Sequence, residues 1–254
     1  MTPTTHHAPR NYHPENIAGK AVLVTGGTTG IGFAIAKLLL ERGARVFTFG
    51  RDENDLQSAL TKLRESGEVY GMTADQSQPE EIKRIFREAD ARLGGLDILV
   101  NNAAVGVKSA VDNSLEEIQY GVNVNLFGYM ACAHEVIARM KAKGSGHIVC
   151  IGSLSAHQRE EESDIYVATK AGIQAYCASL RKGVSDQNIK VSLIEPGLVA
   201  SDMSGSSPEE ETEQQRQGKM LAGEDIAEAV HYVLTQPARC DVIGIQIRPH
   251  QEKI

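Results

Sequence analysis

Thr25-Gly26-Gly27-Thr28-Thr29-Gly30-Ile31-Gly32 is the stretch that decides the fold of this chain. It directly follows a short apolar run at residues 21–24 and opens a longer helical pattern. Glycines allow a tight turn and let a pyrophosphate approach the backbone, while free N–H groups at a helix start favour an anion. A strand, a glycine loop and a helix in this order predict a dinucleotide-binding unit.

Beyond this loop, short apolar runs alternate with longer helical patterns. We expect helices at residues 32–42, 53–66, 79–93, 115–141, 166–186 and 223–235, and strands at residues 21–24, 45–49, 69–72, 98–100, 147–151, 190–194 and 242–247. This alternation predicts an α/β fold of the Rossmann type, a doubly wound parallel sheet of about seven strands with helices on both faces. Without a repeat or an interdomain linker, residues 16–254 are expected to form a single domain.

Two polar segments fall outside the alternation. Residues 1–15 are expected to be a flexible N-terminal arm, in which the adjacent His6 and His7 are interpreted as solvated and not as metal ligands. Residues 201–217 are rich in Ser, Glu and Gln and have no apolar periodicity. They predict either an exposed loop or a substrate lid, and their position after the sixth strand favours the lid.

Net charge, apolar runs and cysteine spacing limit the binding partners and the cellular setting that we expect. The formal net charge of −7 argues against a nucleic-acid or anionic-membrane surface as the main partner. No apolar run approaches the roughly 20 residues that a bilayer span requires. The 4 cysteines are scattered without metal-ligand spacing, which indicates a reduced, cytoplasmic setting and no metal site.

The end of the second predicted strand bears on the choice of cofactor. An acidic residue there would accept the ribose hydroxyls of NAD, but this chain has Arg51, whose guanidinium suits a 2′-phosphate. NADP(H) is therefore favoured over NAD(H), although the preference rests on one charge and a solvated arginine is the alternative. Asp75 is expected to accept a hydrogen bond from the adenine amino group, to cap the helix that begins at Pro79, or to do both.

Tyr166 and Lys170 are four residues apart and therefore lie on one face of a helix. A lysine ammonium held nearby favours the phenolate, so we expect it to lower the pKa of the tyrosine. The spacing alone is common on exposed helices. Together with the glycine loop it indicates an acid–base group beside a nucleotide.

With these residues in view, the chain resembles the short-chain dehydrogenase/reductase family over essentially its whole length after the N-terminal arm. The matching motifs, in chain order, are Thr-Gly-x-x-x-Gly-x-Gly at residues 25–32, Asn101-Asn102-Ala103-Ala104, Val124-Asn125-Leu126, Ser153, Tyr166 with Lys170, and Pro196-Gly197. The resemblance implies an NAD(P)-dependent oxidoreductase that interconverts a carbonyl and a secondary alcohol, usually as a homodimer or homotetramer. Residues 245–250 depart from the family's frequent Gly-Gly tail, so both assemblies stay open.

The resemblance also implies four catalytic residues. Tyr166 would be the general acid in reduction and the base in oxidation. Lys170 would lower its pKa and bond the nicotinamide ribose. Ser153 would hold the substrate oxygen, and Asn125 would hold a water that links the lysine to solvent.

The remaining site residues follow from the same motifs. The cofactor is expected to contact Gly26, Thr28, Thr29, Gly30, Ile31, Gly32, Arg51, Asp75, Asn102, Ala103, Tyr166, Lys170, Pro196, Gly197, Val199 and Ser201. The substrate is expected to contact Val105, Val107, Leu154, His157 and Leu198. Acidic runs at residues 160–162 and 209–211 are usually solvated, but if they rim the pocket they would disfavour anionic substrates. The alternatives are an NAD-dependent alcohol dehydrogenase and a non-catalytic nucleotide-sensing protein.

Overall fold

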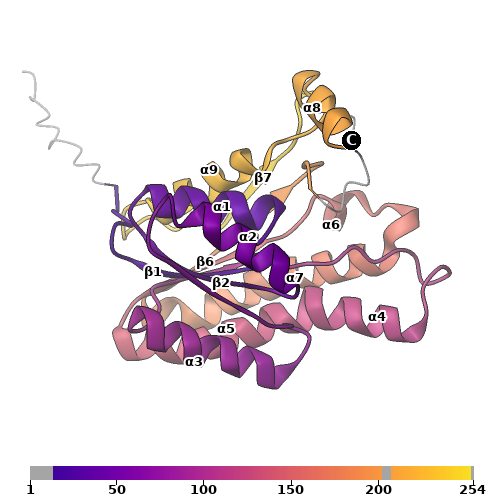
Figure 1. Cartoon of the computed structure of the whole chain (residues 1–254). Helices are drawn as coiled ribbons and strands as arrows, with labels where there is room; N and C mark the ends of the chain where they lie inside the picture. The colour runs from indigo at the N-terminus through magenta and orange to yellow at the C-terminus, as the bar shows by residue number, and fades with distance from the viewer. Residues whose placement is uncertain (1–13, 202–206, 253–254) are drawn as a thin grey trace, which may run out of the picture.

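The computed structural model describes residues 14–201 and 207–252, which form one α/β domain (Figure 1). This confirms the predicted fold class. Residues 1–13 of the predicted arm and residues 202–206 of the predicted lid lie outside the described residues. No helix in the described part of the chain is long and apolar enough to cross a membrane.

Seven strands in the described ranges form one parallel sheet in the order β3-β2-β1-β4-β5-β6-β7. Their bounds are β1 (Ala21–Thr25), β2 (Arg45–Gly50), β3 (Val69–Thr73), β4 (Ile98–Asn101), β5 (Gly146–Ile151), β6 (Ile189–Pro196) and β7 (Gly244–Ile247). The order reverses between β1 and β4. At such a switch point the loops after neighbouring strands lead to opposite faces of the sheet, which leaves a crevice at the carboxyl ends.

Helices cover both faces of this sheet (Figure 1). One face carries α1 (Gly30–Glu41), α2 (Glu53–Leu63) and α9 (Gly223–Leu234), and the other carries α3 (Pro79–Leu93), α5 (Gly128–Lys143) and α7 (Asp164–Val184). Each face of the sheet has its own hydrophobic core, and the side chains of β1 point alternately into the two. Val22 and Val24 belong to the core that contains Ile35, and Leu23 belongs to the core that contains Phe86. Every residue of β1 is buried, as expected for a strand that is covered by helices on both faces of a parallel sheet.

The helix predicted at residues 115–141 is interrupted. The structure has α4 (Leu115–Val122), a π-helical turn η1 (Asn123–Phe127) and then α5. A π turn inserts one extra residue into the helical repeat, often at a functional site. The 3.6-residue apolar pattern runs on through all three pieces, so the interruption is not visible in the sequence.

Of the two alternatives for residues 201–217, the exposed loop is wrong for residues 208–216, which form the helix α8 (Pro208–Arg216). Ser207 and Glu210 form a capping box and Pro208 occupies the first turn, both of which favour a helix start. None of its residues is buried, so α8 has no apolar stripe that a sequence pattern could reveal. Three short turns were also not predicted: α6 (Ser155–Gln158), η2 (Glu161–Ser163) and η3 (Ser185–Gln187).

Candidate active site

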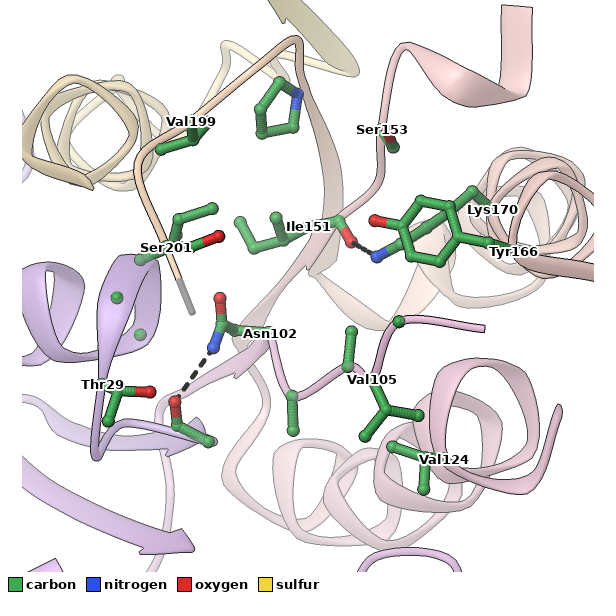
Figure 2. Close-up of a pocket in the computed structure, with 18 of the residues that line it drawn as sticks. Thr29, Asn102, Val105, Val124, Ile151, Ser153, Tyr166, Lys170, Val199 and Ser201 are labelled. Atoms are coloured by element: carbon green, nitrogen blue, oxygen red, sulfur yellow. Dashed lines mark hydrogen bonds between the residues drawn. The ribbon is translucent and has the colours of Figure 1, made fainter. Parts of the chain in front are cut away.

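A cavity of about 1290 Å³ opens at the carboxyl ends of the strands, where the sheet order reverses (Figure 2). Every residue that was predicted to contact the cofactor lines it, and so do Ser153 and the predicted substrate residues Val105, Val107, Leu154 and Leu198. Asn125 and His157 do not line it. The topology therefore brings together motifs that are spread over most of the sequence.

The glycine loop between β1 and α1 leaves room for a ligand along its backbone. Gly26 has a φ of 65° and lies against Ala103, and Gly30 has a φ of 51°, a conformation that favours glycine. A Cβ at Gly32 would collide with the carbonyl oxygen of Gly26. Thr29, the N-cap of α1, makes no side-chain cap hydrogen bond, which leaves the first N–H groups of the helix for a ligand. This cradle fits the pyrophosphate of a dinucleotide.

Polar side chains hold the cradle in shape, and the sequence analysis did not assign this role to the buried Thr25 and Thr48. Thr25 Oγ1 accepts hydrogen bonds from the backbone N–H groups of Asn102 (2.8 Å) and Ala103 (2.9 Å). The side chain of Asn102 donates to the carbonyl oxygens of Thr25 and Gly26. Thr48 on β2 accepts from the N–H of Gly27 at 3.0 Å. The loop is thus tied to both neighbouring strands without a ligand.

Arg51 and Asp75 meet at one end of the cavity through a residue that the sequence analysis did not single out. Nη1 of Arg51 donates to the hydroxyl of Tyr120 on α4, and this hydroxyl donates to Oδ2 of Asp75. Burial raises the pKa of Tyr120, so it remains a hydroxyl at neutral pH. Oδ1 of Asp75 accepts from the N–H of Ser77 at 2.8 Å, which fixes the turn before α3. The alternative that Asp75 caps this helix is wrong, because Gln78 is the N-cap residue and the Asp75 carboxylate bonds the turn that precedes it.

Tyr166 and Lys170 lie side by side on α7 (Figure 2). Lys170 is only 2% exposed; its Nζ donates to the carbonyl oxygen of Ile151 at 3.0 Å and lies 5.4 Å from the centroid of the Tyr166 ring. Burial lowers the pKa of Lys170 to about 8. Burial also raises the pKa of Tyr166 to about 12, opposed by a hydrogen bond with Ser153 and reinforced by the charge of Glu160. The expected lowering of the tyrosine pKa is therefore not found, because the burial of the phenol outweighs the hydrogen bond with Ser153.

Ser153 begins a short chain of hydrogen bonds. Its hydroxyl donates to Ser155 Oγ at 3.1 Å, and Ser155 in turn donates to Oε1 of Glu160 at 3.3 Å. Glu160 lines the cavity, whereas residues 209–211 of the second acidic run are not among the lining residues. The first run therefore reaches the rim of the site through Glu160.

Two predicted residues face elsewhere. Asn125 in η1 is fully buried, and its side chain bonds both the N–H and the carbonyl oxygen of Val105 at 2.8 Å. It fixes the loop after β4, and its predicted water relay stays a prediction. Nε2 of His157 lies 3.0 Å from Oε1 of the buried Glu195 and 2.9 Å from Nε2 of Gln246. The structure does not place His157 where a substrate would contact it, because this carboxylate holds the ring away from the cavity.

The family model described as short chain dehydrogenase matches residues 20–212. The chain belongs to the short-chain dehydrogenase family. An uncharacterized oxidoreductase of Staphylococcus aureus (strain MRSA252) is 34% identical to this short-chain dehydrogenase over 234 residues, which is 92% of this chain and 98% of the relative. A second uncharacterized oxidoreductase, from Staphylococcus saprophyticus, is 31% identical over 233 residues, 91% of this chain and 97% of the relative.

Solved structures agree with the fold of this short-chain dehydrogenase. A short chain dehydrogenase from Burkholderia cenocepacia in complex with NADP is 27% identical, with a TM-score of 0.81 over 92% of this chain and 98% of that one. L-sorbose reductase from Gluconobacter frateurii, complexed with NADPH and L-sorbose, is 24% identical, with a TM-score of 0.83 over 92% of this chain and 97% of that one. The short-chain dehydrogenase described here is therefore an NAD(P)-dependent oxidoreductase.

Proposed function

We propose that this short-chain dehydrogenase is an NADP(H)-dependent oxidoreductase that interconverts a carbonyl and a secondary alcohol on a small or medium organic molecule. The observation that carries the proposal is the pairing of Tyr166 with Lys170 on α7, in the same cavity as the glycine cradle. An acid–base hydroxyl beside a nucleotide site is the arrangement that carbonyl reduction requires.

The nicotinamide supplies the hydride when it is bound. Tyr166 holds the proton: with a pKa raised to about 12 it stays protonated at neutral pH and can donate to the oxygen of a carbonyl. Lys170 stabilises the phenolate that remains, and its proton is held loosely because burial lowers its pKa to about 8. Ser153 orients the substrate oxygen with its hydroxyl.

The preference for NADP(H) rests on Arg51 at the end of β2. It lines the cavity, and the neighbouring Asp52 does not counter it directly, because its side chain caps α2 by accepting from the N–H groups of Asn54 and Asp55. Two solved relatives at 27% identity are complexes with NADP, which supports the same choice. An NAD-dependent alcohol dehydrogenase with the same catalytic groups is the alternative.

A turnover screen with NADPH and NADP⁺ across ketones, aldehydes, quinones and secondary alcohols tests the proposal. Tyr166→Phe should lower kcat by at least about 100-fold while leaving NADPH binding intact, since only the proton donor is lost. Tyr176→Phe, on the same helix but outside the cavity, is the matched control. A Tyr166→Phe protein that works at the wild-type rate would overturn the mechanism. NADPH binding without any turnover would identify a nucleotide-sensing protein instead.

The segment around α8 is proposed as part of a substrate lid. Oε1 of Glu211 accepts a hydrogen bond from the N–H of Ser201 at 3.1 Å, which ties this exposed helix to a residue that lines the cavity. Glu211→Ala should release that tie and raise the KM for substrate, with kcat less affected. An unchanged KM for substrate would contradict the proposal that the segment around α8 is part of a substrate lid.

We also propose that the protein is a homodimer or homotetramer and that it is located in the cytoplasm. Strand β7 lies at one edge of the sheet, paired only with β6 in the described part of the chain. Light scattering on the purified full chain would distinguish a monomer, a dimer and a tetramer, and fluorescence microscopy of a tagged chain would test the compartment.

A further inference from the structure

Two carboxylates from distant parts of the chain line the cavity. Glu160 follows α6, and Glu252 belongs to the segment after β7. Ser153, Leu154 and Gly197, which border the same region, come from the ends of β5 and β6. Glu160 contributes to the raised pKa of Tyr166, and Glu252 lies against Gly197, which follows the Pro196 carbonyl that accepts from the N–H of Leu154. A ligand between these residues therefore meets two acidic side chains.

Glu252 presents an acceptor that has no partner. Its Oε2 is buried and makes no hydrogen bond within residues 14–201 and 207–252. Gly197 makes room for it, because a Cβ at that position would collide with this oxygen. The segment is held by Arg248, whose Nη1 donates to the carbonyl oxygen of Glu252 at 2.5 Å. A buried carboxylate oxygen without a donor is unfavourable until a ligand supplies one.

Glu160 is coupled to the serine that is expected to hold the substrate oxygen. It accepts from Ser155, which in turn accepts from Ser153. The negative charge of Glu160 also acts on the proton donor, because it contributes to the raised pKa of Tyr166. A carboxylate at this position accepts hydrogen bonds from hydroxyl groups and repels anions.

The positive charges of the cavity do not offset these carboxylates. Among the lining residues that the structure describes, the cations are Arg51 at the end of β2 and Lys170, whose ammonium is engaged by the carbonyl oxygen of Ile151. A phosphate or carboxylate group on the substrate would therefore meet like charge. A plain alkyl group would leave the buried Oε2 of Glu252 unsatisfied.

We propose that Glu160 and Glu252 select an uncharged substrate that carries hydroxyl groups next to its reacting carbonyl, or the corresponding polyol. This inference rests on the proposed function, because it names the substrate class of the same site. The two carboxylates accept the additional hydroxyl groups and exclude phosphorylated and carboxylated analogues.

Four compounds with a four-carbon ketone skeleton test the selection with NADPH: erythrulose, erythrulose 4-phosphate, 2-butanone and 1-amino-2-butanone. We expect erythrulose to have the highest kcat/KM, by about tenfold or more over erythrulose 4-phosphate and 2-butanone, as one charge-assisted hydrogen bond allows. Glu160→Gln and Glu252→Gln should each shrink the preference over erythrulose 4-phosphate by about tenfold. Because a ratio of kcat/KM values cancels the shared proton transfer, an altered pKa of Tyr166 does not mimic this result.

Glu161→Gln is the matched control, since it removes the same charge one residue along, from a side chain that does not line the cavity. It should leave the substrate preference unchanged. Equal kcat/KM values for erythrulose and its phosphate would overturn the proposal. So would a preference for 2-butanone, or for the amino ketone, which would indicate an apolar or a cation-binding wall.

A binding measurement separates this inference from the proposed function. Saturation-transfer NMR on the NADP⁺-saturated protein should detect erythritol and not erythronate, and Glu160→Gln should reduce this discrimination. If the protein binds erythritol and not erythronate but turns over none of the compounds, the selection by Glu160 and Glu252 is supported and the oxidoreductase reaction on carbonyls is refuted. Turnover of carbonyl compounds combined with equal binding of erythritol and erythronate would support the oxidoreductase reaction and refute the selection by Glu160 and Glu252.

Discussion

Nη1 of Arg51 lies 2.6 Å from the hydroxyl oxygen of Tyr120, and the guanidinium carbon lies 5.5 Å from the centroid of the same ring. Arg51 is exposed, so an unsupported side chain would sample many rotamers and lose entropy on binding a phosphate. Tyr120 restrains it at the end of the cavity, and Asp75 restrains Tyr120 through the 3.2 Å hydrogen bond that it accepts. Tyr120 is a positioning residue for the cation that is proposed to choose the cofactor.

Arg51→Ala should weaken NADPH binding by at least about tenfold and change NADH binding little, since a charge-assisted bond to the 2′-phosphate is lost. Tyr120→Phe should weaken NADPH binding less, by roughly threefold, because the arginine remains but is no longer hydrogen-bonded. Fluorescence titration of both cofactors measures this difference. Tyr70→Phe is the control, since Tyr70 also lies under an arginine, Arg92, but outside the cavity. Equal losses for both cofactors would refute the phosphate role of Arg51.

Glu160→Gln should shift the pH profile of alcohol oxidation to lower pH. Oxidation requires the phenolate of Tyr166, and the negative charge of Glu160 helps to raise the pKa of this residue above its ordinary value. Removing the charge lowers the pKa, so kcat/KM should reach its plateau at lower pH. Glu161→Gln should leave the profile in place. A profile that moves equally in both variants would mean that only the overall charge matters.

His147 makes the protein less stable in acid. The ring is 8% exposed on β5, its Nε2 lies 2.9 Å from Ser192 Oγ, and burial lowers its pKa to about 3. Because the unfolded chain takes up this proton near pH 6.5, the stability from His147 is complete above that pH and is lost as the pH falls toward 3.

Between pH 7 and pH 4.5 this loss should amount to about 2 to 3 kcal/mol of unfolding free energy. Urea unfolding of the wild type and of His147→Leu at both pH values gives the contribution as the difference between their two pH responses. His134→Leu, at an exposed position, should respond as the wild type does. A response of His147→Leu equal to that of the wild type would exclude His147 as the cause.

Thr25→Val should loosen the glycine cradle while keeping the shape of the side chain. It removes the acceptor for two N–H groups, those of Asn102 and Ala103, and leaves both donors without Oγ1. We expect a loss of about 2 to 4 kcal/mol in the free energy of unfolding. Dinucleotide binding should weaken as well. Thr61→Val on the exposed face of α2 is the control, and a change in urea midpoint no larger than for that variant would contradict this account.

The parts of the fold that the sequence predicted are those with a strong periodic or local signal. Pro79–Leu93 was predicted residue for residue, because a proline begins α3 and Gly94, with a φ of 75°, ends it. The glycine loop was found because its residue types follow directly from the backbone path. By contrast, η1 continues the helical pattern, and α8 has no buried face to leave a pattern.

The candidate site divides in the same way. Residues in contiguous motifs were predicted, whereas Tyr120 and Glu252 belong to no motif and reach the site only through tertiary packing. His157 was expected at the site because it follows Ser153 closely. Its actual partner, Glu195, lies 38 positions away in the sequence and leaves no local trace. The direction of the Tyr166 pKa shift likewise depends on burial, which sequence spacing does not report.

The hydrogen bond between Thr25 and Asn102 joins residues that are 77 positions apart. A ribosome makes the chain from its N-terminus, so the glycines of the loop emerge well before the segment that holds them. Until β4 has been synthesised and has paired with β1, Thr25 has neither of its backbone donors. A nascent chain that stalls before Asn102 should therefore bind no dinucleotide, although it already carries every glycine of the cradle.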